Sequence, residues 1–242
     1  MALAALLLLP ASLATPPPHL FMFIVDDLGW ANVGWNRETP TPEVRTPTMD
    51  GLVAEGIELQ RHYVFSCCSP SRASVLSGRL PPHVETWLTD PSISNPADTE
   101  SGWAGIPRSM TGIAKMLKQA NYSTAAVGKW DAGMATPQHT PKGRGFDSSL
   151  IYYHHANDYW TRQEGGCTVN TSDPLVFYNR NDEFCTENDG FCTENDGQRP
   201  TEHLPCIDLW TNDGPARTVN ASAGDTYEEY MFKAEALRVC EK

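Results

Sequence analysis

The sequence predicts an α/β fold with a largely parallel central sheet flanked by helices. Segments typical of strands alternate along the chain with segments typical of helices, which is the pattern of parallel strands joined by helical crossovers. A chain of 242 residues with 40% hydrophobic side chains can also bury a sizeable core. Because ligands bind such sheets at the carboxyl ends of the strands, the residues that follow each predicted strand are the first candidates for a functional site.

Three segments are predicted to be strands. Residues 20–25 are continuously apolar and bounded by turn residues, as in a strand buried on both faces. Residues 57–65 and 123–127 are the second and third. Asp26 and Asp27 follow the first strand, and Lys129 lies at the end of the third, so charged side chains are placed at two strand ends.

Three helices are recognised from capping or apolar spacing. Thr46-Pro47 offers a cap and a first-turn proline, and Gly56 ends that first helix. A later segment has apolar side chains at i, i+3, i+4 and i+7, the stripe of a surface helix: Met110, Ile113, Ala114 and Leu117. A capping box, Thr226-Tyr-Glu-Glu229, opens a last helix that runs towards Cys240.

The helix that follows Cys68 is the sharpest local feature. Ser69 suits a cap, Pro70 a first helical position and Gly78 a stop, so Cys68 is expected just before a helix N-terminus. That end attracts anions, and Arg72 can lean back towards it with a planar guanidinium. The spacing is consistent with a reactive side chain facing a tetrahedral anion, and equally with a structural cysteine beside a capped helix.

The charge balance bears on possible partners. The chain carries 18 Lys and Arg against 30 Asp and Glu, a formal net charge of −12. No basic stripe is available to neutralise phosphates, so nucleic acid is not an expected partner.

The N-terminus reads as a secretory signal peptide over residues 1–14. Residues 2–9 form an Ala/Leu run, and Ser12 and Ala14 supply small residues near the cleavage position. A membrane anchor is the alternative, but the run is too short to cross a bilayer. Three glycosylation sequons, at Asn121, Asn170 and Asn220, agree with a secretory, non-integral protein that is secreted or lysosomal/vacuolar.

The seven cysteines form an odd set, which in a secreted chain needs an explanation. Six of them could pair if Cys68 has another role: Cys67, Cys167, Cys185, Cys192, Cys206 and Cys240. Residues 184–190 and 191–197 repeat the heptapeptide FCTENDG, so one of these cysteines could be a duplicate. The acidic repeats lack the ligand ladder of an EF-hand and are interpreted as a solvated loop.

The motif Cys68-Ser69-Pro70-Ser71-Arg72, with Ser77-Gly78-Arg79 behind it, resembles the signature of the type I sulfatases, the arylsulfatase-like, formylglycine-dependent family. Further similar motifs occur in the same order as in the family: Phe23-Ile-Val-Asp26-Asp27-Leu-Gly29, Gly128-Lys129-Trp130, Arg144-Gly145-Phe146-Asp147 and Asp208-Leu-Trp210. The resemblance implies an alkaline-phosphatase-like sandwich. It also implies a sulfatase N-terminal catalytic domain over residues 19–242, truncated at the C-terminus and with an irregular insertion at about 160–224.

The resemblance implies hydrolysis of sulfate esters. Cys68 would be converted to formylglycine by the formylglycine-generating enzyme, and one hydroxyl of the hydrated aldehyde would attack sulfur while the second later expels sulfate. Arg72 and Lys129 would balance charge on the sulfuryl oxygens. Asp26, Asp27 and the modified Cys68 would hold Ca²⁺ or another divalent cation, which requires the chain to bend after residue 25. The substrate would be a small-molecule or glycan sulfate ester.

One position departs from the family pattern. Many sulfatases carry a His two residues after the motif Lys, and here that position is Asp131, which accepts hydrogen bonds but does not donate them when ionised. His139, His154 and His155 are nearby in sequence and could supply the imidazole, with His154 and His155 also candidates for substrate binding beside Lys129. Replacing both His154 and His155 without loss of turnover would end this hypothesis.

Other family residues have no counterpart here. An Asp-Asn pair, a further His and a further Lys come from the second half of a chain roughly twice this length, so the sequence is expected to be the N-terminal portion of a sulfatase. Two alternatives remain open. One is a phosphoester or phosphonate hydrolase on the same scaffold, and the other is a non-catalytic secreted homologue that keeps the anion pocket.

Overall fold

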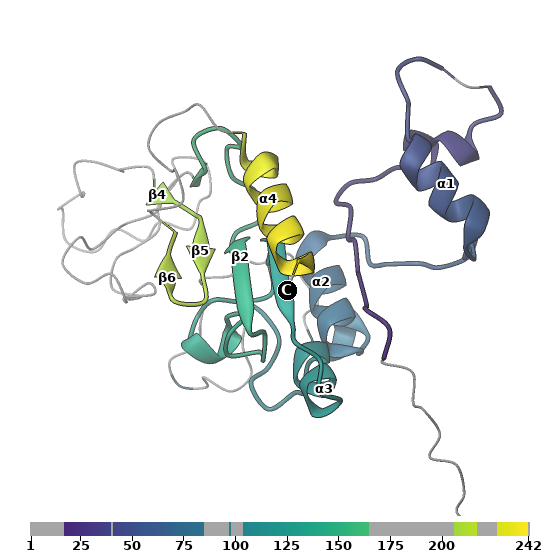
Figure 1. The fold of residues 1–242 in the computed structure, drawn as a ribbon. Coiled ribbons are helices and arrows are strands. Elements are labelled where there is room, and N and C mark those ends of the chain that lie inside the picture. The colour runs from purple at the N-terminus through teal and green to yellow at the C-terminus, as the bar shows by residue number, and fades with distance from the viewer. Residues whose placement is uncertain are drawn as a thin grey trace, which may run out of the picture. The chain divides into compact units, whose positions relative to one another are not determined.

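The computed structural model describes residues 17–39, 41–84, 97, 104–164, 206–216 and 227–241 (Figure 1). The chain forms two compact units, Met1–Arg61 and His62–Lys242. The predicted signal peptide, the repeated heptapeptide and the sequons at Asn170 and Asn220 lie outside the described residues. Asn121 lies in an exposed turn.

The first unit contains helix α1 (Pro47–Glu55) and two single turns of 3-10 helix, η1 (Trp30–Asn32) and η2 (Gly34–Asn36). The predicted ends of α1 are confirmed, since Thr46 is its N-cap and Gly56 its C-cap.

The Thr46 side chain also links α1 to the turn that precedes it. Its hydroxyl accepts a hydrogen bond from the Gly34 amide at 2.7 Å and donates one to Asp50 Oδ1 at 2.7 Å. The threonine therefore joins η2 to α1 instead of capping the helix with its own oxygen, and no side-chain cap bond is present at this end.

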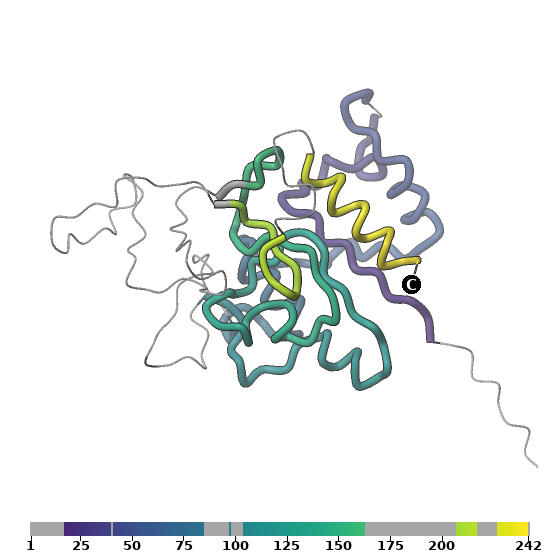
Figure 2. Tube along the Cα trace, turned by 60° about the vertical axis from the view of Figure 1, so that its left-hand side comes forward, coloured from purple at the N-terminus to yellow at the C-terminus, as the bar shows by residue number. Residues whose placement is uncertain are grey.

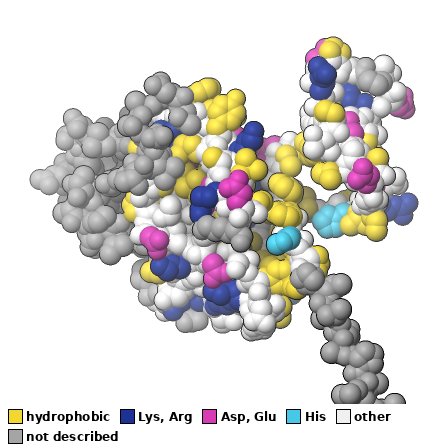
Figure 3. Space-filling view, viewed as in Figure 1, with side chains coloured by type: hydrophobic (Ala, Val, Ile, Leu, Met, Phe, Trp, Pro, Cys, Tyr) yellow, Lys and Arg dark blue, Asp and Glu magenta, His cyan; other side chains and the backbone are white. Residues whose placement is uncertain are grey.

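Two of the predicted strands do not form. Residues 20–25 are extended but exposed, with Phe23 at 84% of its full accessible surface, and Figure 3 shows hydrophobic side chains at the molecular surface. Residues 57–65 also have no regular structure. An apolar run becomes a strand only when a neighbouring strand completes its backbone hydrogen bonds, and within the described residues neither run has one.

The second unit is built on a four-stranded mixed sheet in the order β1 (Ala125–Lys129), β2 (Ser148–Tyr152), β5 (Trp210–Thr211) and β6 (Gly214–Pro215). The strands β1 and β2 are parallel, with Lys129 opposite Tyr152. The α/β class is thereby confirmed, and β1 overlaps the third predicted strand.

The sheet is less parallel than the sequence predicts. Strand β5 is antiparallel to β2, and β6 is antiparallel to β5 because a tight turn at Asn212 and Asp213 reverses the chain between them. A separate antiparallel pair joins β3 (Gln163–Glu164) to β4 (Cys206–Ile207).

In the described parts of this unit, three α-helices accompany the sheet: α2 (Cys68–Ser77), α3 (Ile113–Gln119) and α4 (Glu228–Cys240), with single turns at η3 (Pro81–His83) and η4 (Pro137–His139). All three α-helices were predicted. Gly78 ends α2 as expected, with a left-handed φ of 69° that glycine adopts without steric cost.

Two of the helices begin at other residues than the sequence suggests. The N-cap of α2 is Cys67, so Cys68 is the first helical residue and not the residue before the helix. The N-cap of α4 is Tyr227, whereas the Thr226 of the predicted capping box lies outside the described residues.

The helices cover opposite faces of the sheet, which gives a layered α/β sandwich. Because side chains alternate along a strand, Ile151 packs with Ala73 of α2 on one face, while Leu150 packs with Met231 and Phe232 of α4 on the other. Helix α4 contacts both β1 and β2, and Figure 1 shows it beside β2, while Figure 2 shows it as a separate layer.

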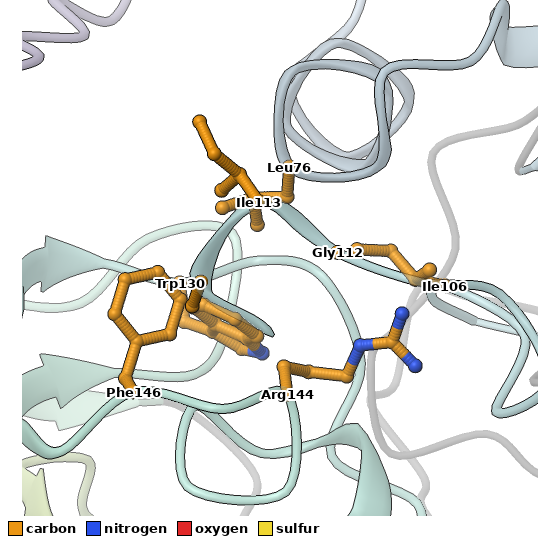
Figure 4. A pocket seen from close by; sticks show the side chains of 8 residues that line it. Leu76, Ile106, Gly112, Ile113, Trp130, Arg144 and Phe146 are labelled. Atoms are coloured by element: carbon orange, nitrogen blue, oxygen red, sulfur yellow. The ribbon is translucent and has the colours of Figure 1, made fainter. Parts of the chain in front are cut away.

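A small pocket lies where α2, α3 and the segment around Trp130 meet (Figure 4). The ring of Trp130 meets that of Phe146 edge to face, with centroids 5.9 Å apart, and Arg144 closes one side by donating to the carbonyls of Pro107 and Met110. Cys68, Arg72 and Lys129 do not line it. We therefore interpret this pocket as part of the packing between helices, separate from the predicted site.

No helix in the described parts of the chain combines the length and the apolar character needed to span a membrane.

Candidate active site

The predicted site is assembled at the carboxyl ends of β1 and β2. The parallel pairing continues beyond both strands, because the Trp130 amide donates to the Tyr152 carbonyl at 2.8 Å and the Asp131 amide to the Tyr153 carbonyl at 3.2 Å. This register brings the residues after β1 beside the residues after β2, as expected for the functional edge of a parallel pair.

Asp131 is the centre of the hydrogen-bond network. Its residue is 0% exposed, and its backbone has a positive φ of 46°, a conformation that Asp adopts more readily than most residues. Its Oδ1 accepts a hydrogen bond from Ser69 Oγ at 2.9 Å and lies 2.8 Å from His155 Nδ1, while Oδ2 lies 3.4 Å from Lys129 Nζ. The carboxylate is thus enclosed by three side chains from three segments.

Helix α2 brings its first turn to this carboxylate. Ser69, only 1% exposed, makes the bond to Asp131, and Cys68 immediately precedes it in a partly buried position. Arg72, 8% exposed, lies one turn further along and donates from Nη1 to the Lys129 carbonyl at 2.7 Å. The start of α2 is therefore fixed to the end of β1 by two side-chain hydrogen bonds.

The charges at this junction suit an anion. Arg72 and Lys129 bring two cationic groups, of which the Lys129 side chain is only 5% exposed, and the positive end of a helix lies beside them. Asp131 offsets part of this charge. The arrangement can hold a tetrahedral oxyanion next to Cys68.

The three candidate histidines have three different environments. His155 contacts Asp131, and its side chain stays 31% exposed. His154 turns away to Asp208, with Nδ1 2.8 Å from Oδ2, and is 3% exposed. His139 is 1% exposed, with Nδ1 2.8 Å from Thr136 Oγ1. Only His155 is joined to the Asp131 network by the described contacts.

The electrostatic environment of His139 further separates it from the site. Burial, together with the charges of Arg144 and Arg108, lowers the pKa of His139 to about 4. The ring is therefore neutral near neutral pH and belongs to the packing of its loop.

A second buried network lies under the start of α4, and sequence reasoning did not identify it. Asp208 accepts hydrogen bonds from the amides of Tyr153 and His154 as well as from the His154 ring. Glu228, fully buried, accepts from Asn157 Nδ2 at 2.8 Å. Burial raises the pKa of Glu228 to about 7, with smaller contributions from nearby acids that include Asp208. The two motifs Asp208-Leu-Trp210 and Thr226-Tyr-Glu-Glu229 mark these residues, but nothing in their spacing shows that they approach each other.

The predicted cation ligands Asp26 and Asp27 lie in the first unit, and Cys68 lies in the second. Asp26 and Asp27 form an exposed turn in which Asp27 has a positive φ of 53°, so the expected bend after residue 25 is confirmed. The bend allows both side chains to approach, with a carboxylate oxygen of each within 4.8 Å of the other. Two hard oxygen donors at this spacing fit part of the ligand set of a divalent cation such as calcium.

The family model described as Sulfatase matches residues 18–200. The chain is 38% identical to N-acetylgalactosamine-6-sulfatase of Mus musculus over 148 residues, which are 61% of this chain and 28% of the relative. It is also 38% identical to arylsulfatase G of Rattus norvegicus, over 64% of this chain and 26% of the relative.

A solved structure, that of Ps i-CgsB, is 35% identical and covers 56% of this chain and 28% of that chain, with a TM-score of 0.48. The chain thus spans about a quarter of the length of the curated relatives that it matches. Since the family model extends over more than half of the chain and includes Asp26, Asp27, Cys68, Arg72 and Lys129, the chain belongs to the sulfatase family.

Proposed function

We propose that this chain takes part in the hydrolysis of sulfate esters, as the portion of a sulfuric ester hydrolase that carries the attacking residue. The observation that carries the proposal is the junction of α2 and β1, where Cys68 begins a helix and Arg72 and Lys129 lie next to it. Such a junction offers a nucleophile and positive charge to the same tetrahedral anion.

Arg72 and Lys129 would bind the sulfuryl oxygens. Both side chains are mostly withdrawn from water, and the hydrogen bond from Arg72 to the Lys129 carbonyl holds the two segments together before substrate arrives. Preorganised cations in a site with little water stabilise developing negative charge far more than exposed cations do. These two residues would therefore stabilise the transition state as the ester bond breaks.

Cys68 would act after conversion to formylglycine, which supplies a hydrated aldehyde oxygen as nucleophile. Its setting supports this, because it lies at the first position of a helix within the Cys-Ser-Pro-Ser-Arg motif, and no disulfide joins it to another of the described cysteines. The conversion would take place in the secretory pathway through the formylglycine-generating enzyme, with the mature protein secreted or delivered to a lysosome or vacuole.

Asp26 and Asp27 would hold the divalent cation, most suitably Ca²⁺, because both supply hard carboxylate oxygens from a single turn. When bound, such an ion would polarise the sulfate group and lower the barrier to attack. The turn at these residues would serve this purpose, since a carboxylate oxygen of Asp26 and one of Asp27 lie within 4.8 Å of each other.

The names of the relatives support sulfate over phosphate. N-acetylgalactosamine-6-sulfatase and arylsulfatase G are both named for the removal of sulfate. The substrate class of the present chain would accordingly be a small-molecule or glycan sulfate ester.

The decisive experiment combines mass spectrometry with paired substrates. The full-length protein is purified from a secretory host that contains the formylglycine-generating enzyme, and the peptide with Cys68 is analysed beside the same peptide from Cys68→Ala. Conversion of Cys68, with faster hydrolysis of an aryl sulfate than of the matched aryl phosphate, is expected. An unmodified thiol, a disulfide at Cys68, or a preference for the phosphate would contradict the proposal.

A further inference from the structure

We propose that an exposed aromatic patch beside the start of α4 binds uncharged sugar residues of the glycan that carries the sulfate ester. The patch consists of Tyr159, Trp160, Tyr227 and Tyr230. This inference rests on the proposed function and extends it, because it selects glycan sulfate esters as the substrate class and gives the glycan a second contact surface on this chain.

The four rings of the aromatic patch form one cluster around Tyr227. The centroid of its ring lies 5.1 Å from that of Trp160, 5.6 Å from that of Tyr230 and 6.0 Å from that of Tyr159. Tyr227 is partly buried, whereas Tyr159 is 50%, Trp160 51% and Tyr230 67% exposed. Rings that pack on one another and stay half exposed form a contiguous apolar surface, which is typical of a binding site.

Hydrogen bonds hold together the two segments that carry the rings. Asp158 Oδ1 accepts from the amides of Trp160 at 3.0 Å and Thr161 at 2.6 Å, which closes a tight turn. The Tyr159 carbonyl accepts from the Glu228 amide at 2.8 Å and so joins this turn to the first residue of α4. The rings are therefore fixed before a ligand arrives, and this lowers the entropic cost of binding.

The charges around the aromatic patch favour an uncharged ligand. In the described segments 157–162 and 227–233, the exposed charged side chains are two acids and one base, Asp158, Glu229 and Lys233. Cationic side chains lie instead at the junction of α2 and β1. A sulfate group and an unsulfated sugar of the same glycan would thus be attracted to different surfaces.

A sugar ring has the chemistry that this surface can bind. One face of a pyranose presents C–H groups with a small positive charge, and the face of an aromatic ring is negative, so the two stack. Tyrosine and tryptophan supply this contact with few rotatable bonds, and tyrosine hydroxyls can exchange hydrogen bonds with sugar hydroxyls. A purely apolar ligand would instead remove water from these hydroxyls and from the Asp158 carboxylate without replacing it.

The position of the aromatic patch in the chain links it to the candidate site. Trp160 follows His155, the histidine that contacts Asp131, in the segment after β2. Five extended residues span at most about 18 Å, so the two α-carbons lie within that distance, which a glycan of a few sugars can cover. Both surfaces lie beyond the carboxyl end of β2, where ligands of such sheets bind.

The first test measures binding without turnover. The full-length protein is labelled with 5-fluorotryptophan, and the ¹⁹F resonance that Trp160→Phe removes is assigned to Trp160. Neutral trisaccharides of glucose, galactose or N-acetylgalactosamine are then added. At least one of them should shift this resonance saturably, with a Kd of about 1–10 mM, as expected for a small and open contact surface.

Two variants on α4 show whether the rings bind the sugar. Tyr230→Ala removes an exposed ring and should raise this Kd at least about fivefold. Leu237→Ala, at a residue that is 54% exposed and has no ring, should leave the Kd unchanged. Tighter binding of the sulfated trisaccharides at Trp160 would overturn the inference. So would the absence of any shift, which is the result if another segment or another protein covers the indole.

The second test compares two sulfate esters as substrates. Trp160→Ala should lower the ratio of kcat/KM for a trisaccharide sulfate to kcat/KM for an aryl sulfate about tenfold, mainly through KM, because the lost contact stabilises bound substrate and transition state alike. Trp160→Phe keeps a ring and should restore most of this ratio. An equal loss on both esters would overturn the inference, because it would show a structural role for Trp160. A thermal melt of each variant controls for folding.

The two levels of proposal fail in different ways. If the unsubstituted protein hydrolyses no sulfate ester, the proposed function fails, and the ¹⁹F titration still decides whether the aromatic patch binds sugars. If the aryl sulfate is hydrolysed but no trisaccharide shifts the Trp160 resonance, only the inference about the aromatic patch fails.

Discussion

The guanidinium of Arg72 donates from Nη1 to the backbone carbonyl of Lys129 at a distance of 2.7 Å. The Arg72 side chain thereby fixes the end of β1, which carries Lys129, the second cationic residue of the candidate site. The charge of the site and the docking of α2 on β1 depend on the same side chain.

Arg72→Lys should therefore lower the rate of hydrolysis more than the same exchange at a surface arginine does. Lysine keeps the charge but loses the planar fork, so kcat for an aryl sulfate should fall by about 10²–10³-fold, as for other lost transition-state donors. Kinetics and a thermal melt of each variant check this. Arg238→Lys, where a half-exposed guanidinium pairs with Glu235 within α4, is the control. Equal rates in the two variants would speak against a role for Arg72 in the transition state.

Ser69→Ala should destabilise the second unit by about 1–2 kcal/mol, because it leaves the buried Asp131 carboxylate without one of its donors. Urea unfolding of the two proteins measures the difference. Ser74→Ala on the same helix is a matched control, since the buried Ser74 hydroxyl makes no hydrogen bond within the described residues. A loss at position 74 as large as at 69 would show that helix propensity and not the Asp131 contact is responsible.

Glu228 should make the protein less stable as pH rises from about 4.5 to 7. Its pKa is about 7 in the folded chain, against an ordinary value of 4.5 that applies once the chain unfolds, so the folded protein binds the extra proton within this window and loses that stabilisation above it. The contribution is roughly 2–4 kcal/mol. Glu228→Gln should flatten the decline in unfolding free energy, whereas Glu241→Gln, exposed at the helix end, should not.

His139 should give the opposite slope at lower pH. Because its pKa is about 4 in the folded chain and its ordinary value is 6.5, the unfolded chain takes up the proton first, and stability falls as pH drops from 6.5 to 4. The two slopes oppose each other over much of this range, so Glu228→Gln should reveal the His139 dependence more clearly. If a Glu228→Gln, His139→Gln double variant still loses stability as pH falls from 6.5 to 4, His139 is not the group that causes this loss.

Chelation of divalent cations should abolish hydrolysis, and added Ca²⁺ should restore it, if Asp26 and Asp27 hold the ion. Asp27→Asn tests the charge alone, because Asn also tolerates a positive φ. Calorimetry should show Ca²⁺ affinity lowered by at least tenfold in this variant. Asp50→Asn, at an acidic residue of α1 in the same unit, should keep the affinity, and an equal loss there would refute the assignment.

Local signals in the sequence predicted the helices better than the strands. The cap and proline at Thr46-Pro47, the glycine stop at Gly78 and the apolar stripe of α3 depend on neighbours a few residues away, and each marks an observed helix. Residues 20–25 have the composition of a buried strand but remain exposed, because a strand depends on a partner that its own sequence does not specify.

In the candidate site, too, the sequence predicted local features better than contacts between distant segments. Motifs identified Cys68, Arg72, Lys129 and Asp131, and the structure brings the segments that carry them together. Which histidine would join them was not predictable, since His154 and His155 are adjacent and chemically identical. Only the register of β1 against β2 decides that His155 meets Asp131 while His154 meets Asp208.

That register makes the loop between β1 and β2 a sensitive place for changes of length. A single residue inserted or deleted at its end, just before Ser148, would shift β2 by one position relative to β1 and exchange its two faces. The β2 side chains that now pack against α2 would then face α4, and those that pack against α4 would face α2. After an insertion, His154 would stand where His155 now does. Homologues with this chemistry should therefore differ in the length of this loop mainly at points where the chain can absorb the change before β2 begins.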